Sequence, residues 1–203
     1  MSGVGLRRFT AGFVRAVILT LTVAGCAVWC SAARAAPGAL DPSFGTGGVQ
    51  LSTLGNADDA QGQATAETPS GEYVVAGAVG YSGGLELGIA EYTSSGQLDP
   101  SFGSGGTVVA NLGNTTSQVN AVAIEPNGDV LIAGTADMAS SATGVLLALY
   151  SPTGQPVSGF GSNGSEILSV GNGGDAQANA VVIDGGNVLV TGTASHSVVA
   201  IVS

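Results

Sequence analysis

The chain has 203 residues, of which 34 are glycine and only 9% are charged, and its formal net charge is -10. All 14 acidic residues lie at or after Asp41, and the only basic residues are Arg7, Arg8, Arg15 and Arg34. No Lys or Arg follows position 34, so residues 35–203 cannot neutralise phosphate groups. Nucleic acid and an anionic membrane surface are therefore excluded as partners of these residues. We interpret the acidic surface as a means of keeping the protein soluble, and recruitment of Ca²⁺ is the alternative.

The first 36 residues have the three parts of a secretory signal peptide. Three arginines precede an apolar run, residues 16–29, which is shorter than the roughly 20 residues that a membrane-spanning helix needs. Small residues follow this run, and Ala33-Arg34-Ala35 matches the A-x-A cleavage pattern. We therefore expect a signal-peptide helix that is removed beside Ala35 or Ala36, and a secreted or cell-surface protein.

A lipoprotein signal is the alternative to simple cleavage. The sequence VAGC ending at Cys26 resembles a bacterial lipobox, in which Cys26 would carry the lipid. The residues after Cys26 stay apolar, whereas lipoproteins usually turn polar there, so ordinary secretion is favoured over lipid anchoring. Both cysteines, Cys26 and Cys30, lie in this segment, so simple cleavage would leave no thiol for a disulfide or a metal site.

Beyond residue 37 the sequence repeats three times with a period of 58 residues. GALDPSFGTGGV returns as GQLDPSFGSGGTV and, in a diverged form, as GQPVSGFGSNGS, which divides the chain into repeats of about 38–95, 96–153 and 154–203. Several equivalent positions carry the same residue in two or in all three copies. They are Phe44, Phe102 and Phe160; Gly77, Gly134 and Gly192; and Tyr92 and Tyr150. We expect these residues to have a structural role in the repeat.

Each repeat has the pattern of four short strands separated by turn residues. In the second copy the expected strands are residues 107–112, 119–125, 129–136 and 144–150, with the hairpin signal Pro126-Asn127-Gly128 between the second and third. Four antiparallel strands per repeat are typical of a propeller blade. We therefore predict an all-β fold of three four-stranded antiparallel blades, a partial β-propeller that follows the signal-peptide helix. A β-solenoid is the structural alternative, although its coils are usually shorter.

These motifs, taken in order, resemble the bacterial delta-60 repeat. The resemblance rests on LDPSFGxGG, the hairpin, the strand ending in VVAG, LIAG or LVTG, and a strand ending in Tyr, and it covers Gly38 to Ser203. It implies a propeller of an exported or surface protein, in a family without an established common activity. The basic residues usual near the hairpin and the Tyr-bearing strand are replaced, so the resemblance implies the fold and not a shared ligand. The replacing residues are Glu72, Asp129, Asn187 and Glu91.

The number of repeats predicts that more blades are needed. Closed propellers typically have four to eight blades, and three are too few to close a ring. Either this sequence is a fragment of a longer chain, which we favour, or the missing blades come from another chain.

Two motifs that could signal chemistry have simpler explanations. The single histidine, His196, is expected in an exposed turn, and no second His or Cys lies beyond the signal segment to join it. Residues 159–164 spell G-x-G-x-x-G, but a dinucleotide site needs this string to follow a strand and open a helix. Here it leads into a predicted strand, so we assign no cofactor-binding residues.

The carboxylates are the remaining candidates for chemistry. Asp41 and Asp99 occupy equivalent places beside a proline, where an aspartate usually forms an Asx turn with its own backbone. Other acids lie in the loop before the second strand or near its end, and those in the loop could hold Ca²⁺ together with backbone carbonyls, although no EF-hand spacing is present. These are Asp58, Asp59 and Asp175, and Glu125 and Asp184.

Regular repeats without a unique polar constellation predict a non-catalytic binding or structural scaffold with an extracellular protein or glycan as its partner. On this interpretation we assign no catalytic, cofactor-binding or metal-ligating residue. The alternative is a propeller enzyme that acts on an extracellular polysaccharide through paired acidic residues from different blades. Two or more acids gathered at the propeller axis would favour the enzyme, and acids scattered on outer loops would favour the scaffold.

Overall fold

The computed structural model describes residues 38–55, 59–112, 116–139, 142–171, 173–195 and 197–202. The regular secondary structure within these ranges is β-strand, and no helix in them is long and apolar enough to cross a membrane. Several residues discussed above lie outside the described ranges, so the structure does not test the predictions made for them. They are the signal segment with Cys26, Ala35 and Ala36, together with Asp58 and His196.

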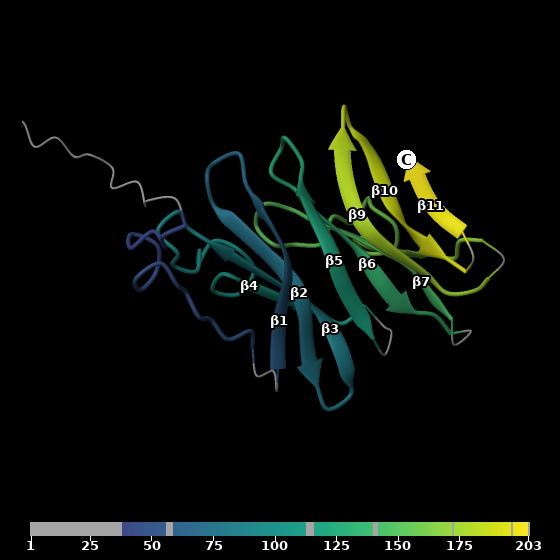
Figure 1. Ribbon diagram of the computed structural model, residues 1–203, viewed down its shortest axis with the longest axis horizontal. Helices are drawn as coiled ribbons and strands as arrows, with labels where there is room; N and C mark the ends of the chain where they lie inside the picture. Colours follow the sequence, from purple (N-terminus) through teal and green to yellow (C-terminus); the bar gives the residue numbers. More distant parts are fainter. Residues whose placement is uncertain are drawn as a thin grey trace, which may run out of the picture. The chain divides into compact units, whose positions relative to one another are not determined.

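Eleven strands form three antiparallel sheets in which strands follow one another in chain order (Figure 1). Sheet 1 contains β1 (Asp59–Glu67), β2 (Tyr73–Tyr81), β3 (Gly84–Tyr92) and β4 (Thr107–Ala110). Sheet 2 contains β5 (Ser117–Ile124), β6 (Val130–Asp137), β7 (Thr143–Tyr150) and β8 (Ser165–Leu168). Sheet 3 contains β9 (Ala176–Asp184), β10 (Asn187–Ala194) and β11 (Ser197–Val202). The predicted all-β, antiparallel, four-stranded architecture is confirmed for sheets 1 and 2.

The prediction of three four-stranded sheets is wrong for sheet 3, which has three strands among the described residues. The cause is the way the chain is shared between sheets. We expected residues 107–112 to open the blade of the second repeat, but β4 pairs with β3 as the last strand of sheet 1. In the same way β8, from the third repeat, completes sheet 2. Each four-stranded sheet therefore takes three strands from one repeat and its fourth strand from the next.

The LDPSFG connector folds the chain back onto the sheet that it has just left. The amide of Asp99 donates to the carbonyl of Glu91, and the amide of Glu91 donates to the carbonyl of Gly106, each over 2.9 Å. Gly103 has φ of +55°, and a Cβ there would lie 2.2 Å from the carbonyl oxygen of Thr107. Glycine adopts this backbone without a steric penalty, which explains why the connector needs it.

The three repeated glycines lie where two strands come unusually close. A Cβ on Gly77, Gly134 or Gly192 would lie 1.8 to 1.9 Å from the carbonyl oxygen of a glutamine on the first strand of the same sheet, which is β1, β5 or β9. The strand pairing shifts by one residue at each of these places, as in a β-bulge. The repeated glycine thus leaves room for the bulged backbone.

The sheets stack face to face, with the inner strands β1, β5 and β9 of neighbouring sheets in contact. We call the face that a sheet turns toward the next sheet its back, and the opposite face its front. The back of sheet 1 meets the front of sheet 2 in a cluster of fully buried side chains. Its members include Val74, Ala76, Leu87 and Ile89 from sheet 1 and Val130, Ile132, Ala148 and Tyr150 from sheet 2.

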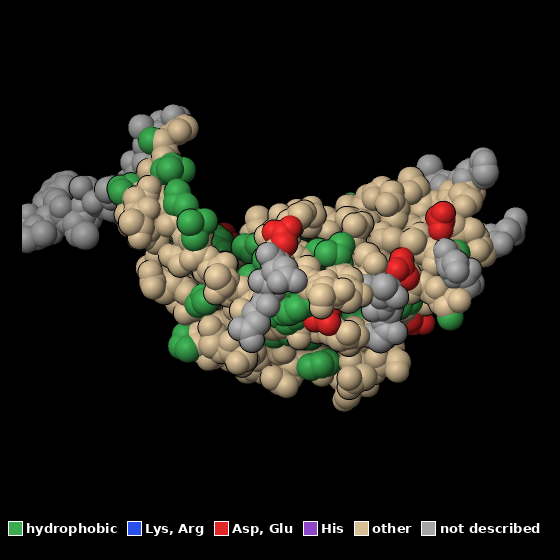
Figure 2. Space-filling model, turned by 90° about the horizontal axis from the view of Figure 1, so that it is seen from below, with side chains coloured by type: hydrophobic (Ala, Val, Ile, Leu, Met, Phe, Trp, Pro, Cys, Tyr) green, Lys and Arg blue, Asp and Glu red, His purple; other side chains and the backbone are tan. Residues whose placement is uncertain are grey.

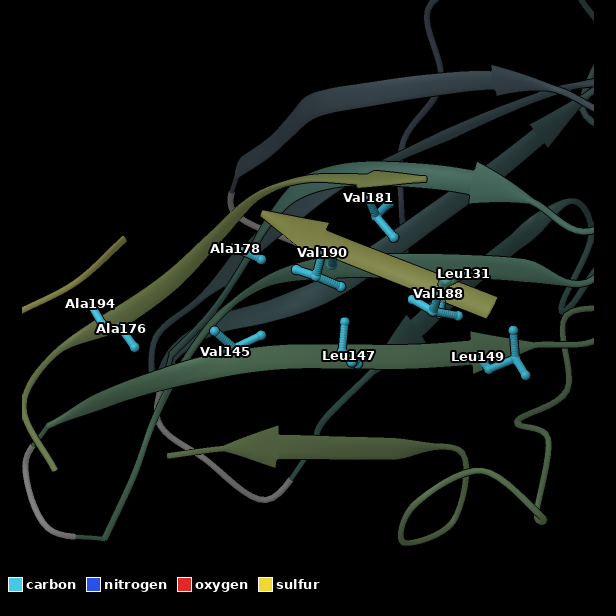
Figure 3. Close-up of a cluster of buried hydrophobic side chains, with 11 residues drawn as sticks. Leu131, Val145, Leu147, Leu149, Ala176, Ala178, Val181, Val188, Val190 and Ala194 are labelled. Carbon is cyan, nitrogen blue, oxygen red and sulfur yellow. The ribbon is translucent and has the colours of Figure 1, made fainter. Parts of the chain in front are cut away.

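The same arrangement recurs between sheets 2 and 3. Figure 3 shows Val181, Val188 and Val190 of sheet 3 directed toward Val145, Leu147 and Leu149 of sheet 2. Full burial of such side chains contributes about 1.5–3 kcal/mol each relative to exposure. Because consecutive sheets bury each other in this way, a sheet at either end of the stack has one face without a neighbour among the described residues.

Candidate functional site

The front of sheet 1 is an open face. Its residues are only half-buried, whereas the residues at the equivalent positions of sheet 2 are buried. Val130, Ile132 and Tyr150 of sheet 2 are at most 2% exposed. By the repeat, their equivalents on sheet 1 are Tyr73, Val75 and Tyr92, and all three of these are only half-buried. The front of sheet 1 is thus an apolar, aromatic surface at the place where the repeat normally packs a second sheet.

This open face is hollowed into a groove. The groove has a volume of about 530 Å³ and contains Phe44 and Gln50 besides Tyr73, Val75 and Tyr92. The Phe44 ring meets the Tyr73 ring edge to face, with centroids 5.9 Å apart and planes at 75°. A smaller hollow continues from it across Val75 and Tyr92. Aromatic side chains with a polar rim are the usual composition of a binding surface.

The repeated phenylalanines show the same contrast between closed and open positions. Phe102 is fully buried in the cluster between sheets 1 and 2. Phe160 is half-buried against the cluster between sheets 2 and 3. Phe44 is half-buried and lines the groove on the front of sheet 1.

Large apolar side chains are exposed at both ends of the stack. Leu40, Val49 and Leu51, which precede sheet 1, are 63%, 46% and 88% exposed. On sheet 3, Leu189 is 38% exposed, although its equivalent Leu131 on sheet 2 is fully buried.

The aspartates of the connector form the Asx turns that the sequence predicts. Oδ1 of Asp41 accepts hydrogen bonds from the amide and the hydroxyl of Ser43, over 2.9 and 2.6 Å. Oδ1 of Asp99 accepts the same pair from Ser101, over 2.8 and 2.7 Å. These bonds lower the pKa of both carboxyls, because they favour the ionised form. The prediction of an Asx turn is confirmed at both positions.

Two other carboxylates also hold turns. Glu72 accepts a hydrogen bond from the Thr68 hydroxyl over 2.5 Å within the β1–β2 hairpin. Hydrogen bonds from Ser70 and Thr68 lower the pKa of Glu72. Asp175 accepts the amide of Thr143 over 2.9 Å, which ties the loop before β9 to the β6–β7 hairpin. Glu72 therefore stabilises its own hairpin, and Asp175 joins two segments that are 32 residues apart in the sequence.

Glu91 is the exception among these acids, and its burial could not be read from the sequence. It is only 6% exposed and lies on the strand face of Leu87 and Ile89. Burial raises its pKa to about 7, and the charges of Asp99 and Glu72 add to the shift. At the equivalent position sheet 2 has the buried apolar residue Leu149.

Two further acids that the sequence offered as Ca²⁺ ligands are exposed. Asp59 lies on β1 and Asp184 lies on β9, in different sheets. Figure 2 shows acidic side chains separated across the visible face and no Lys or Arg side chain on it. Within the described ranges no group of three or more His, Cys, Asp or Glu side chains is arranged to hold a metal ion. The G-x-G-x-x-G string lies in turns leading into β8, as predicted.

Comparison with known families indicates the class of this domain. A family model described as domain of unknown function (DUF5122) beta-propeller matches residues 68–102, from the first hairpin to the repeated phenylalanine. Together with the antiparallel four-stranded sheets, this match indicates a β-propeller domain of a repeat family. No curated protein matches the chain.

Proposed function

We propose that this protein is an exported, non-catalytic β-propeller scaffold that acts through the open faces and edges of its sheet stack. The observation that carries the proposal is the front of sheet 1. Its groove contains the aromatic residues Phe44, Tyr73 and Tyr92. At the interface between sheets 1 and 2, the residues at the equivalent positions are buried by the neighbouring sheet. Such a face fits an extracellular protein partner that supplies an apolar surface.

Two further observations support the scaffold. Asp41, Asp99 and Glu72 are engaged in turn hydrogen bonds, which is a structural use of carboxylates. The first 36 residues have the charge and hydropathy pattern of an export signal. Mass spectrometry of protein secreted by a bacterial host tests the export. An N-terminus at Ala36 or Pro37 supports simple cleavage, and a lipid-modified Cys26 overturns it in favour of the lipoprotein signal.

One observation favours the enzyme as a second candidate. The environments of Glu91 and Asp99 move their pKa values in opposite directions, upward for Glu91 and downward for Asp99. A proton donor and an ionised carboxylate are the pair that glycoside hydrolysis needs. Glu91, however, is buried on the back of sheet 1, and Oδ1 of Asp99 already accepts two hydrogen bonds from Ser101.

A turnover assay separates the two candidates. The full chain and its Glu91→Gln variant are incubated with soluble extracellular polysaccharides such as alginate, xylan and pectin, and new reducing ends and unsaturated ends are measured. The scaffold predicts the same background for both proteins. Turnover that falls at least about 100-fold in the variant, the usual effect of removing a general acid, would establish the enzyme and refute the scaffold.

A further inference from the structure

We propose that the groove on the front of sheet 1 binds an arginine side chain of the partner protein. The guanidinium group lies against the rings of Tyr73 and Tyr92 and donates hydrogen bonds to the carboxylate of Asp41. This inference rests on the proposed scaffold function and names the group by which the partner is recognised. Residues 41–94 contain every residue that lines the groove.

The front of sheet 1 carries three polar or polar-tipped side chains at positions where the other repeats are aliphatic. They are Thr65, Glu67 and Tyr73. In the second and third repeats the strand pairing places valine or isoleucine at these positions, and all six pack into the clusters between sheets. These six are Val122, Ile124 and Val130, and Val181, Ile183 and Val188. A carboxylate and two hydroxyls are costly to bury under an apolar sheet. The face therefore has the composition of a surface for a partly polar ligand.

The rings of the groove present a surface that attracts cations. Tyr73 pairs directly with Glu67 on β1 and with Tyr92 on β3, so these three side chains form one row on the same face. The Phe44 ring stands edge to face against Tyr73, at 75° between the planes. Both tyrosines are only half-buried. The face of an aromatic ring is electronegative and attracts a cation, most often the guanidinium of arginine.

Carboxylates lie beside these rings. Asp41 lines the same groove, and its Oδ1 accepts two hydrogen bonds from Ser43. Its Oδ2 accepts no hydrogen bond from the described residues. The bonds from Ser43 lower the pKa of Asp41, which keeps this carboxyl ionised at neutral pH. The exposed Glu67 adds a second carboxylate next to Tyr73. A guanidinium can stack on a ring and donate to a carboxylate at the same time, because its five N–H donors lie in one plane.

The charge of the chain favours a ligand that brings its own cation. No Lys or Arg follows Arg34, so no basic side chain of residues 35–203 can pair with Asp41 or Glu67. Arginine fits the groove better than lysine, because a guanidinium is planar and more weakly hydrated than an ammonium group. Arginine and tyrosine are also enriched among the residues that contribute most to binding between proteins. An arginine set in the apolar surface of the partner thus matches both the rings and the carboxylates.

A titration with arginine and its uncharged isostere tests the inference. The probes are N-acetyl-arginine N-methylamide and N-acetyl-citrulline N-methylamide, in which a urea group replaces the guanidinium. The tyrosine ring signals of the full chain are followed by NMR, each assigned from its Tyr→Phe variant. Tyr81 and Tyr150 serve as internal controls, because neither lines the groove.

We expect the arginine probe to shift the signals of Tyr73 and Tyr92 and to leave those of Tyr81 and Tyr150 in place. It should bind at least about 3-fold more tightly than the citrulline probe, as a cation on an aromatic surface implies. Equal affinity for the two probes overturns the proposal. So does an arginine titration that leaves Tyr73 and Tyr92 unshifted, or one that shifts all four tyrosines alike.

A variant gives a second readout. Tyr73→Val places in the groove the valine that both other repeats carry at this position, Val130 and Val188, and removes the ring. We expect it to weaken binding of the arginine probe at least about 3-fold and to reduce the preference over citrulline. Tyr81→Val makes the same change at the other end of β2 and should bind like the parent chain. Circular dichroism checks that both variants are folded. Equal binding by the two variants would overturn the proposal.

The carboxylate has its own variant. Asp41→Asn removes the charge but keeps a side-chain oxygen that can accept from Ser43, so the turn is preserved. It should weaken the arginine probe and leave the citrulline probe unchanged, and an unchanged arginine affinity would contradict the role of Asp41.

Failure of this inference and failure of the scaffold are distinguishable. Equal binding of both probes, together with no turnover of polysaccharide, refutes the arginine site and leaves the scaffold in place. Turnover that is lost in Glu91→Gln refutes the scaffold whatever the probes do.

Discussion

Phe102 and Phe44 occupy the same position of the repeat but differ in what covers them. Phe102 lies between sheets 1 and 2 and is fully buried, whereas Phe44 lies on the front of sheet 1 and is half-buried in an open groove. Tyr150 and Tyr92 differ in the same way, since Tyr150 is 2% exposed and Tyr92 is half-buried. The comparison teaches that a repeat residue becomes a core residue only when a neighbouring sheet covers it. The front of sheet 1 is therefore a core-type surface that no neighbouring sheet covers among the described residues.

The largest expected effect is that of removing the buried ring. Phe102→Ala should lower the free energy of unfolding by about 3–5 kcal/mol, because it leaves a cavity between two sheets. Phe44→Ala should cost about 1 kcal/mol, because that ring is only partly covered. Both changes are measured by urea unfolding. Equal costs would break the distinction between closed and open positions.

The second effect concerns the repeated glycine. Gly134→Ala places a Cβ 1.9 Å from the carbonyl oxygen of Gln118, so the bulge must move, and we expect a cost of about 3 kcal/mol. Gly105→Ala is the control, since nothing lies within 4 Å of its Cβ and only its φ of +64° opposes the change. Its cost should be about 1 kcal/mol. Urea unfolding that ranks Gly105→Ala as the worse variant would refute the role assigned to the glycine.

The third effect is a pH dependence that comes from Glu91. Its pKa is raised from 4.5 to about 7 in the folded state, so the folded chain binds more protons than the unfolded chain between these values. The contribution of Glu91 is therefore most favourable below pH 4.5, and the free energy of unfolding should fall as the pH rises toward 7, by about 1–3 kcal/mol. The lowered pKa values of Asp99 and Glu72 act in the opposite direction, but only at more acidic pH.

Thermal melts at a series of pH values check this prediction. Glu91→Gln should remove the fall in stability between pH 4.5 and 7. Glu166→Gln, an exposed glutamate on β8, controls for the loss of one carboxyl group and should leave the fall in place. A Glu91→Gln profile that still declines like the parent profile would show that Glu91 is not the group responsible.

The smallest effect is that of the Asx turn. Asp99→Ala removes two hydrogen bonds from the turn that returns the chain toward β4, and we expect a cost of about 1 kcal/mol. Ser101→Ala removes only the bond from its hydroxyl and should cost less. Urea unfolding of the two variants gives the comparison, and a larger loss from Ser101→Ala than from Asp99→Ala would count against the Asx turn.

Much of the fold could be predicted because the sequence pattern recurs in three copies, which can be compared with one another. The strands of the second copy lie close to their predicted ranges, and the Asx turns follow from Asp beside Pro and Ser in the connector. The repeat period does not show where a blade begins, however, because the spacing is the same for any choice of starting point. Only the pairing of β4 with β3 shows that the fourth strand comes from the next repeat.

The open face could not be predicted for a related reason. Tyr73, Val75 and Tyr92 look like Val130, Ile132 and Tyr150 as a pattern of apolar residues, and the difference in their burial arises from the sheet that covers one set and not the other. The raised pKa of Glu91 likewise depends on burial and on Asp99 and Glu72, which lie near it only after folding. Sequence spacing alone carries neither fact.

The assignment of the fourth strand is tested most directly inside sheet 2. Cys26→Ser and Cys30→Ser first remove the native thiols. One variant then carries Leu146→Cys and Ile167→Cys, which are paired on β7 and β8. The control variant carries Ile167→Cys and Val182→Cys, which lie on β8 and β9. Peptide mapping after mild oxidation should find the intramolecular disulfide in the first pair and free thiols in the second. A disulfide in the second pair and free thiols in the first would contradict the sheet assignment.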